Sequence, residues 1–204
     1  RILCLGAHSD DIEIGCGGTI LRMLSECPDT DCTWVVFGAG GRRRSEARKS
    51  AGLFLRNAGR TSVNILGFRD GFFPYEGGRI KEYFERMKQE IGDPDLILTH
   101  YRHDLHQDHR LISELTWNTF RDHLILEYEI VKYDGDLGVP NFYVHLDEGI
   151  CAKKIEFIRT CFDTQKDKVW FSEDAFLSIL RIRGIESNSP GRYAEAFYGR
   201  KITF

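Results

Sequence analysis

The sequence predicts an α/β fold with a mostly parallel sheet, and three observations lead to this prediction. Short apolar runs alternate with longer stretches in which apolar residues recur every three or four positions, as in strands followed by amphipathic helices. The 204 residues are 42% hydrophobic, enough to bury a core without disulfide bridges. No internal repeat, linker or low-complexity segment interrupts the chain, so we expect a single domain over residues 1–204.

Short apolar runs mark the expected strands. Residues 2–6 are continuously apolar and end in a polar turn, as in a strand buried on both faces. Three similar runs predict the next strands, at residues 33–37, 63–66 and 96–99. Residues 127–133 and 142–145 predict two further strands joined by a glycine-rich turn.

Helical periodicity fills the intervals between these strands. Residues 11–26 place apolar side chains on one helix face. After a glycine loop at residues 38–41, Ser45 is the expected N-cap of a helix that ends near residue 57. Four more helices are predicted, at residues 79–91, after the second polar cluster to about 120, at 150–162 and at 173–185. Helices between successive parallel strands predict a Rossmann-like three-layer sandwich.

The composition excludes several classes of protein. Twenty-eight basic residues against 31 acidic ones give a net charge of -3, which argues against a nucleic-acid or anionic-membrane binder. No apolar run approaches the roughly 18 residues of a membrane span. The first apolar run lacks a cleavage site, and none of the six cysteines forms a CxxC pair. We therefore expect reduced thiols and a cytoplasmic location.

Two polar clusters follow two of the expected strands. Residues 8–11 (His-Ser-Asp-Asp) come directly after the first strand, and residues 106–109 (His-Gln-Asp-His) come soon after the fourth. Sites in parallel sheets lie beyond the carboxyl ends of the strands, so neighbouring strands would bring the two clusters together. The glycines at residues 15–18 do not form a nucleotide-binding motif, and we interpret them as helix packing positions.

The side chains of these clusters suit a divalent metal ion. A catalytic zinc takes three protein ligands and keeps one position for water. Two imidazoles and one carboxylate meet that number, and His8, Asp11 and His109 form the natural trio. Zn²⁺ is the expected ion, although Fe²⁺ also fits two histidines and one carboxylate.

The remaining polar residues of the clusters suit acid–base chemistry. Asp10 would be a base beside the metal, and His106 an acid or a donor to a developing oxyanion. Asp108 could orient a histidine ring. His100 and His103 are expected to lie outside the ligand set.

The clusters also resemble the motifs of a known family. Residues 7–11 (Ala-His-Ser-Asp-Asp) are similar to the AHPDD motif of the PIG-L/LmbE family of zinc-dependent N-acetylglucosamine-type deacetylases, with Ser9 in place of proline. Residues 104–109 are similar to its HxDH motif with an upstream aspartate. Weaker similarities at residues 43–48, 69–71 and 193–197 extend the resemblance over nearly the whole chain.

This resemblance implies roles for the matching positions. It implies three zinc ligands, namely His8, Asp11 and His109. It also implies that Asp10 is the general base, that His106 stabilises the oxyanion or protonates the leaving amine, and that Asp108 supports the histidine pair. Arg43 and Asp70 would contact sugar hydroxyls. A tyrosine that some members place before the second motif is missing here, where Asp104 occupies the nearest position.

We therefore predict a metal-dependent enzyme that hydrolyses the N-acetyl group of an amino sugar or its conjugate, a small molecule. One alternative is a non-haem Fe²⁺ oxygenase that uses His8, Asp10 and His109, although such enzymes usually have β-rich folds. A second alternative is a carbohydrate-binding protein that kept the metal but lost its catalytic activity. The aromatic loop at residues 72–75 is compatible with a homo-oligomer.

Overall fold

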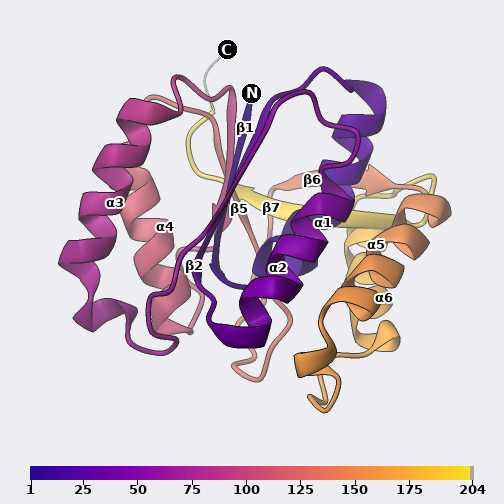
Figure 1. Ribbon diagram of the computed structural model, residues 1–204. Coiled ribbons are helices and arrows are strands. Elements are labelled where there is room, and N and C mark those ends of the chain that lie inside the picture. The colour runs from indigo at the N-terminus through magenta and orange to yellow at the C-terminus, as the bar shows by residue number, and fades with distance from the viewer. Residues whose placement is uncertain (203–204) are drawn as a thin grey trace.

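The computed structural model describes residues 1–202 as one seven-stranded sheet between two layers of helices (Figure 1). The strands are Ile2–His8 (β1), Cys32–Gly38 (β2), Thr61–Ile65 (β3), Leu96–His100 (β4), Ile125–Tyr128 (β5), Phe142–Leu146 (β6) and Tyr193–Gly199 (β7). The α-helices are Asp11–Glu26 (α1), Gly41–Phe54 (α2), Gly77–Glu90 (α3), Gln107–Thr119 (α4), Glu148–Cys161 (α5) and Glu173–Glu186 (α6). Two 3₁₀ turns lie at Phe73–Tyr75 and Asp163–Gln165. The predicted α/β three-layer architecture is confirmed.

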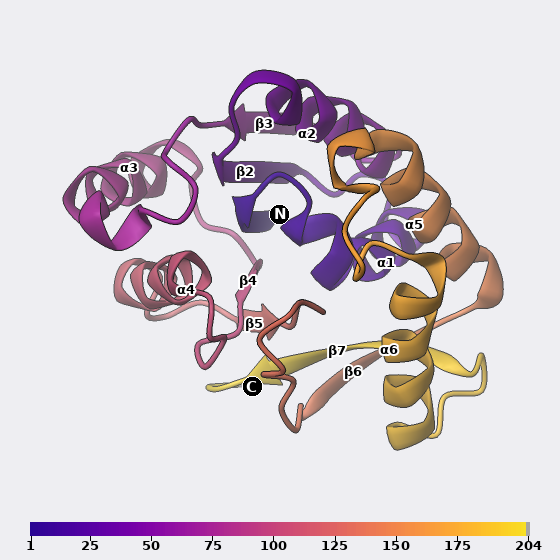
Figure 2. The same cartoon turned by 90° about the horizontal axis from the view of Figure 1, so that it is seen from below.

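Helices cover both faces of the sheet. Figure 2 shows α3 and α4 on one face and α1, α2, α5 and α6 on the other. Because successive side chains of a strand point to opposite faces, β1 contributes to two cores. Leu3 and Leu5 pack under α3 and α4, whereas Ile2 and Cys4 pack under the other helices. This burial on both faces explains why the strand is apolar without alternation.

The strand order brings the two polar clusters together. The order is β3-β2-β1-β4-β5-β7-β6, and β1 pairs in parallel with both β2 and β4. β2 and β3 therefore lie on one side of β1, and β4 and β5 lie on its other side. This reversal of the strand order makes the boundary between β1 and β4 a topological switch point. His8 ends β1 and His100 ends β4, so the clusters that follow them lie at the same edge of the sheet.

The glycines of α1 allow close packing, as predicted. A Cβ at Gly15 would lie 2.1 Å from Cδ2 of Tyr128, and one at Gly17 would lie 2.6 Å from Cε1 of Phe54. Only glycine permits these approaches, so the glycines bring α1 against β5 and α2 rather than forming a phosphate site.

Two predictions about the last strands were wrong. β5 ends at Tyr128 rather than near residue 133, and a long loop over residues 129–141, rather than a short turn, leads to β6, which does not pair with β5. Instead β7, which the sequence did not predict as a strand, lies between them and pairs antiparallel with both. Its alanines and central Glu195 are unfavourable for a strand. Glu195 is stabilised by tertiary contacts, since Lys154 Nζ lies 2.6 Å from its Oε1 and the N–H groups of α1 donate to it.

The start of α2 was also predicted wrongly. The helix begins at Gly41 and its N-cap is Gly40, so Ser45 lies inside the helix. The Ser45 hydroxyl donates to the carbonyl of Arg42, 2.7 Å away. The three arginines at residues 42–44, which precede the predicted N-cap, instead lie in the first turn, because arginine is a good helix former.

Two further expectations concern membrane and redox chemistry. Among residues 1–202, no helix combines the length and the apolar character that crossing a membrane requires. All six cysteines are free thiols, and of these Cys27 is exposed.

Candidate active site

The candidate site lies where β1 and β4 end. His8 is the last residue of β1, Asp11 is the first residue of α1, and His109 lies in the first turn of α4. Figure 2 views the sheet from this edge. All three side chains are buried, with exposures of 8%, 6% and 3%. The fold thus brings together groups that lie about a hundred residues apart in the sequence.

The distances among these three side chains fit a tetrahedral ion. His8 Nδ1 lies 3.1 Å from His109 Nε2 and 3.4 Å from Asp11 Oδ2, and His109 Nε2 lies 3.5 Å from Asp11 Oδ2. A tetrahedral zinc with bonds of about 2.0–2.1 Å holds its ligand atoms about 3.3–3.4 Å apart. One ion can therefore reach all three atoms with little movement of the side chains.

Carboxylates fix the orientation of both rings. His109 Nδ1 donates to Asp104 Oδ2 at 2.9 Å, which leaves the Nε2 lone pair on the side of Asp11. His8 Nε2 lies 3.1 Å from Asp108 Oδ2 and 3.1 Å from Asp70 Oδ1, which leaves Nδ1 toward His109. Such hydrogen bonds on the far nitrogen are usual for metal-binding histidines. The contact of Asp108 with a histidine was predicted from the sequence, whereas the contact of Asp104 with His109 was not.

Two more histidines adjoin the same cluster. Close groups of possible ligand atoms include His8, His106 and His109 in one set, and Asp11, His100 and His109 in another. His106 caps α4, because its Nδ1 accepts the N–H of Asp108 at 3.3 Å, and its Nε2 therefore carries the proton. His100 is fully buried, with Nε2 3.2 Å from Asp11 Oδ2. Its position at the end of an apolar strand is the signal by which the sequence could have placed it here.

The electrostatic environments of the two histidine rings in the trio differ. Although burial acts in the opposite direction, the Asp11, Asp108 and Asp70 carboxylates raise the pKa of His8 well above its usual value. Burial together with the neighbouring His100 lowers the pKa of His109 to about 4, so this ring is neutral at pH 7 and can act as a ligand. Positive charge is therefore stabilised beside His8, as at a metal site.

Asp10 adjoins the trio but has a different environment. Burial and the neighbouring Asp11 carboxylate raise its pKa to about 6, although Arg43 opposes the shift. Its Oδ1 accepts from Arg43 Nη2 at 3.1 Å, while its buried Oδ2 has no hydrogen-bond partner among the described residues. A carboxylate with a pKa near neutrality and one open oxygen suits a general base.

Arg43 links three parts of the site. Its Nε donates to Ser9 Oγ at 2.9 Å, its Nη2 to Asp10, and its Nη1 to Asp70 Oδ2 at 3.2 Å. The Arg43 side chain is 26% exposed and that of Asp70 is 55% exposed, so both reach the mouth of the site. Arg43 and Asp70, which lie on separate elements, are thus brought together beside Asp10.

Asp108 attaches the loop after β3 to α4. Its carboxylate accepts the backbone N–H groups of Gly71 at 2.7 Å and Phe73 at 3.1 Å, in addition to its contact with His8. Gly71 has a φ of +77°, a conformation that favours glycine in this turn. This attachment places Asp70 over the histidine cluster.

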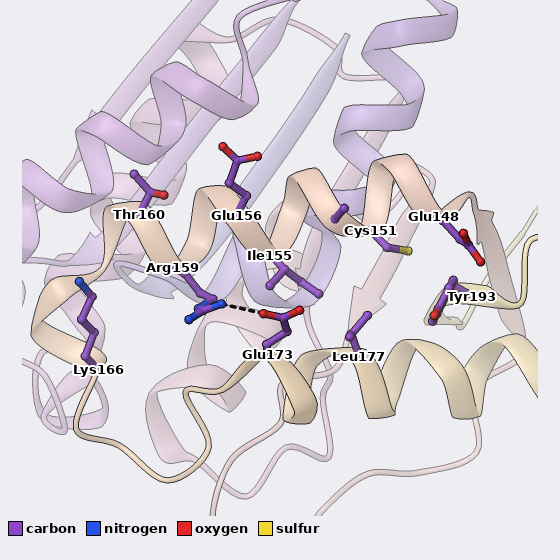
Figure 3. Close-up of a pocket in the computed structure, with 11 residues that line it drawn as sticks. Glu148, Cys151, Ile155, Glu156, Arg159, Thr160, Lys166, Glu173, Leu177 and Tyr193 are labelled. Carbon is purple, nitrogen blue, oxygen red and sulfur yellow. Dashed lines mark hydrogen bonds and ion pairs between the residues drawn. The ribbon is translucent and has the colours of Figure 1, made fainter.

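A groove of about 820 Å³ lies elsewhere, between α5 and α6 (Figure 3). Its apolar floor includes Ile155 and Leu177, and an ion pair of 2.6 Å joins Arg159 to Glu173 across it. The groove shares no residue with the histidine cluster and contains no histidine. We therefore take the buried cluster, and not this groove, as the candidate site.

A comparison with protein-family models identifies the family of this chain. The model described as GlcNAc-PI de-N-acetylase, PIG-L, matches residues 3–120, which is more than half of the chain and includes both clusters. The fold and site define an α/β protein with a buried site of imidazoles and carboxylates at the switch point of its sheet. The chain belongs to the PIG-L family.

Solved structures of related shape support the fold. The N,N'-diacetylchitobiose deacetylase from Pyrococcus horikoshii is 23% identical, with a TM-score of 0.70, and the match covers 96% of this chain and 82% of that one. A zinc-inhibited form of teicoplanin deacetylase is 14% identical with a TM-score of 0.76, covering 97% of each chain. The 4-carboxy-2-hydroxymuconate hydratase from Pseudomonas putida KT2440 is 15% identical with a TM-score of 0.74, covering 100% and 97%. Solved structures with this fold thus include deacetylases and a hydratase. The fold alone does not identify the reaction, which must be inferred from the residues of the site.

Proposed function

We propose that the protein is a metal-dependent N-deacetylase that removes the acetyl group from an N-acetylated amino sugar or sugar conjugate. The observation that carries this proposal is the triangle of His8 Nδ1, Asp11 Oδ2 and His109 Nε2, with sides of 3.1–3.5 Å, beside a carboxylate with an open oxygen. Membership of a de-N-acetylase family supports the reaction class. Zinc is the expected ion, and Fe²⁺ is compatible with the same ligands.

His8, Asp11 and His109 would hold the ion. When bound, a divalent cation supplies Lewis acidity, which makes water a better nucleophile at neutral pH and polarises the amide carbonyl. Asp10 Oδ2 accepts a proton from the attacking water, while Arg43 holds the other oxygen of this carboxylate. The same carboxyl group then returns the proton to the amide nitrogen as the C–N bond breaks, which leaves acetate and a free amine.

We assign to His106 the role of stabilising the charge that develops on the carbonyl oxygen. Its ring centroid lies 4.9 Å from that of His8 and 4.6 Å from that of His109. Because Nδ1 accepts the N–H of Asp108, the Nε2–H group is available to a substrate oxygen. Burial and the neighbouring His8 lower its pKa, so the ring donates as a neutral imidazole.

Arg43 and Asp70 are the groups we propose for sugar recognition. They are the more exposed members of the site, and together they offer donors and acceptors to hydroxyl groups. Arg43 also contacts Asp10, so a sugar bound there would lie beside the proposed base. The oxygenase alternative is less well supported, because it requires Asp10, rather than Asp11, to lie with the two histidines.

The test is acetate release from N-acetyl sugars by the metal-loaded protein. We expect activity to disappear when the metal is removed with a chelator and to return with a stoichiometric amount of Zn²⁺ or Fe²⁺. Asp11→Ala should lose both metal and activity, whereas Asp29→Asn, on the exposed turn after α1, should keep both. Full acetate release by the metal-free protein would refute the proposal, as would failure of the metal-loaded protein to release acetate across the sugar panel.

A further inference from the structure

The loop after β5 carries a buried lysine that the proposed mechanism does not use. Residues 129–141 connect β5 to β6 without helix or strand, and Figure 2 shows this loop crossing the edge at which the parallel strands end. The side chain of Lys132 is only 10% exposed. Burying an ammonium group is costly unless carboxylates surround it, so its partners indicate its role.

Lys132 bridges carboxylates from two different loops. Its Nζ lies 2.6 Å and 2.5 Å from the two oxygens of Asp136, on its own loop. It also lies 3.0 Å from Oδ2 of Asp104, on the loop between β4 and α4. Both carboxylates are buried, with side-chain exposures of 6% and 2%.

A second contact joins the same two loops. Asp136 Oδ2 accepts the backbone N–H of Leu105 at 2.7 Å, one residue beyond Asp104. Asp104 Oδ1 accepts the backbone N–H of His106 at 2.7 Å. The Asp104 carboxylate therefore has three partners: it accepts hydrogen bonds from this N–H group and from the ring of His109, and it forms an ion pair with Lys132. It cannot rotate without breaking at least one of these contacts.

Asp104 connects Lys132 to the ring of His109, and so to the metal site. Asp104 Oδ2 is the atom that contacts both Lys132 Nζ and His109 Nδ1. We propose that Lys132, held in place by Asp136, is a positioning residue for His109: it supplies the charge that keeps the buried Asp104 carboxylate on Nδ1 and so turns Nε2 toward the metal. The inference rests on the metal site proposed above and adds two residues outside the motifs to its support.

The contact pattern distinguishes this role from simple anchoring of the loop. To anchor the loop, the ion pair between Lys132 and Asp136 and the hydrogen bond from Leu105 to Asp136 would be enough. The additional contact with Asp104 couples the lysine to a histidine that it does not touch. Removing Lys132 would leave Asp104 buried and short of one charged partner, so the ring of His109 would be held less firmly.

The first test compares metal affinity in Lys132→Met and wild type. Methionine keeps an unbranched apolar side chain and removes the charge. We expect zinc affinity, measured by competition with a chromophoric chelator, to fall about tenfold or more, as is typical when the partner of a metal-bound histidine is lost. Lys88→Met, an exposed substitution on α3, is the matched control and should bind zinc as wild type does.

The second test observes the histidine without metal. Nitrogen NMR of the imidazoles should place the His109 proton on Nδ1 in wild type and show both tautomers in Lys132→Met. If this variant does not fold, Asp136→Asn takes its place and should show the same change in both measurements. A variant that keeps wild-type zinc affinity and a single Nδ1–H tautomer overturns the positioning role, whereas a wild type that binds no zinc overturns the proposed function itself.

Discussion

Ser9 offers a sharp test of how Arg43 is held. The family motif has proline at this position, whereas here the fully buried Ser9 accepts a hydrogen bond from Arg43 Nε at 2.9 Å. The other two bonds of the guanidinium, to Asp10 and Asp70, are longer, at 3.1 Å and 3.2 Å. The serine hydroxyl thus makes the shortest of the three contacts that fix Arg43.

The expected loss of activity in Ser9→Ala follows from the type of hydrogen bond removed and from the solvent exposure of Arg43. Hydrogen bonds to charged groups contribute about 1.5–3 kcal/mol. Arg43 is 26% exposed, so water replaces part of what Ser9→Ala removes. We therefore expect a loss near the low end, about 1.4 kcal/mol, which corresponds to about a tenfold lower kcat/KM for acetate release. Metal content should not change, since Ser9 touches none of the proposed ligand atoms.

The assay compares wild type and four variants on one N-acetyl sugar. Ser9→Pro restores the family residue but also lacks the hydroxyl, so it should match Ser9→Ala. Ser25→Ala removes a hydroxyl that donates to the Arg22 carbonyl far from the site, and it should behave as wild type. Wild-type kcat/KM in Ser9→Ala, together with a clear loss in Arg43→Ala, would refute the argument that the hydroxyl holds Arg43.

Three further predictions address the base, the packing of α1 and the thiols. Asp10→Asn should lower kcat about 100-fold or more, as expected for loss of a general base, while zinc content measured by elemental analysis stays the same. Gly15→Ala should lower the free energy of unfolding in urea by about 1–3 kcal/mol, because its Cβ would lie 2.1 Å from a tyrosine ring. In contrast, Gly52→Ala, with nothing within 4 Å, should be neutral or stabilising, and equal effects would contradict the packing argument. Burial raises the pKa of Cys151 to about 12, so this thiol is neutral at pH 8 and iodoacetamide should label Cys27 alone in the folded protein. Mass spectrometry that finds rapid labelling of Cys151 would contradict this.

Most of the sheet could be predicted because its signals are local. β1, β2 and β4 are apolar runs, and the helices between them keep one apolar face. The clusters could be predicted as a site because parallel neighbours end at the same edge. The proposed ligands are then close in space because β1 and β4 pair directly.

The last strand and the contacts of Asp104 could not be predicted from the sequence, for one physical reason. β7 has alanines and a buried glutamate, so nothing local marks it as a strand, and contacts from α1 and α5 stabilise it. Asp104 and Lys132 lie 28 positions apart, and neither residue type in a loop indicates a contact with a histidine. Aspartate and lysine are common in exposed loops, and only the burial of Asp104 and Lys132 in the structure distinguishes them from such residues.

By itself the sequence determined the α/β architecture, the two polar clusters and the chemistry that imidazoles and carboxylates can perform, because these depend on residue type and short periodicity. Tertiary structure decided which carboxylate faces which ring nitrogen, which oxygen of Asp10 stays open, and that Ser9 contacts Arg43 and Lys132 contacts Asp104. Those features depend on distances of about 3 Å between segments far apart in the chain, and a hydrogen bond forms or fails within a few tenths of an ångström.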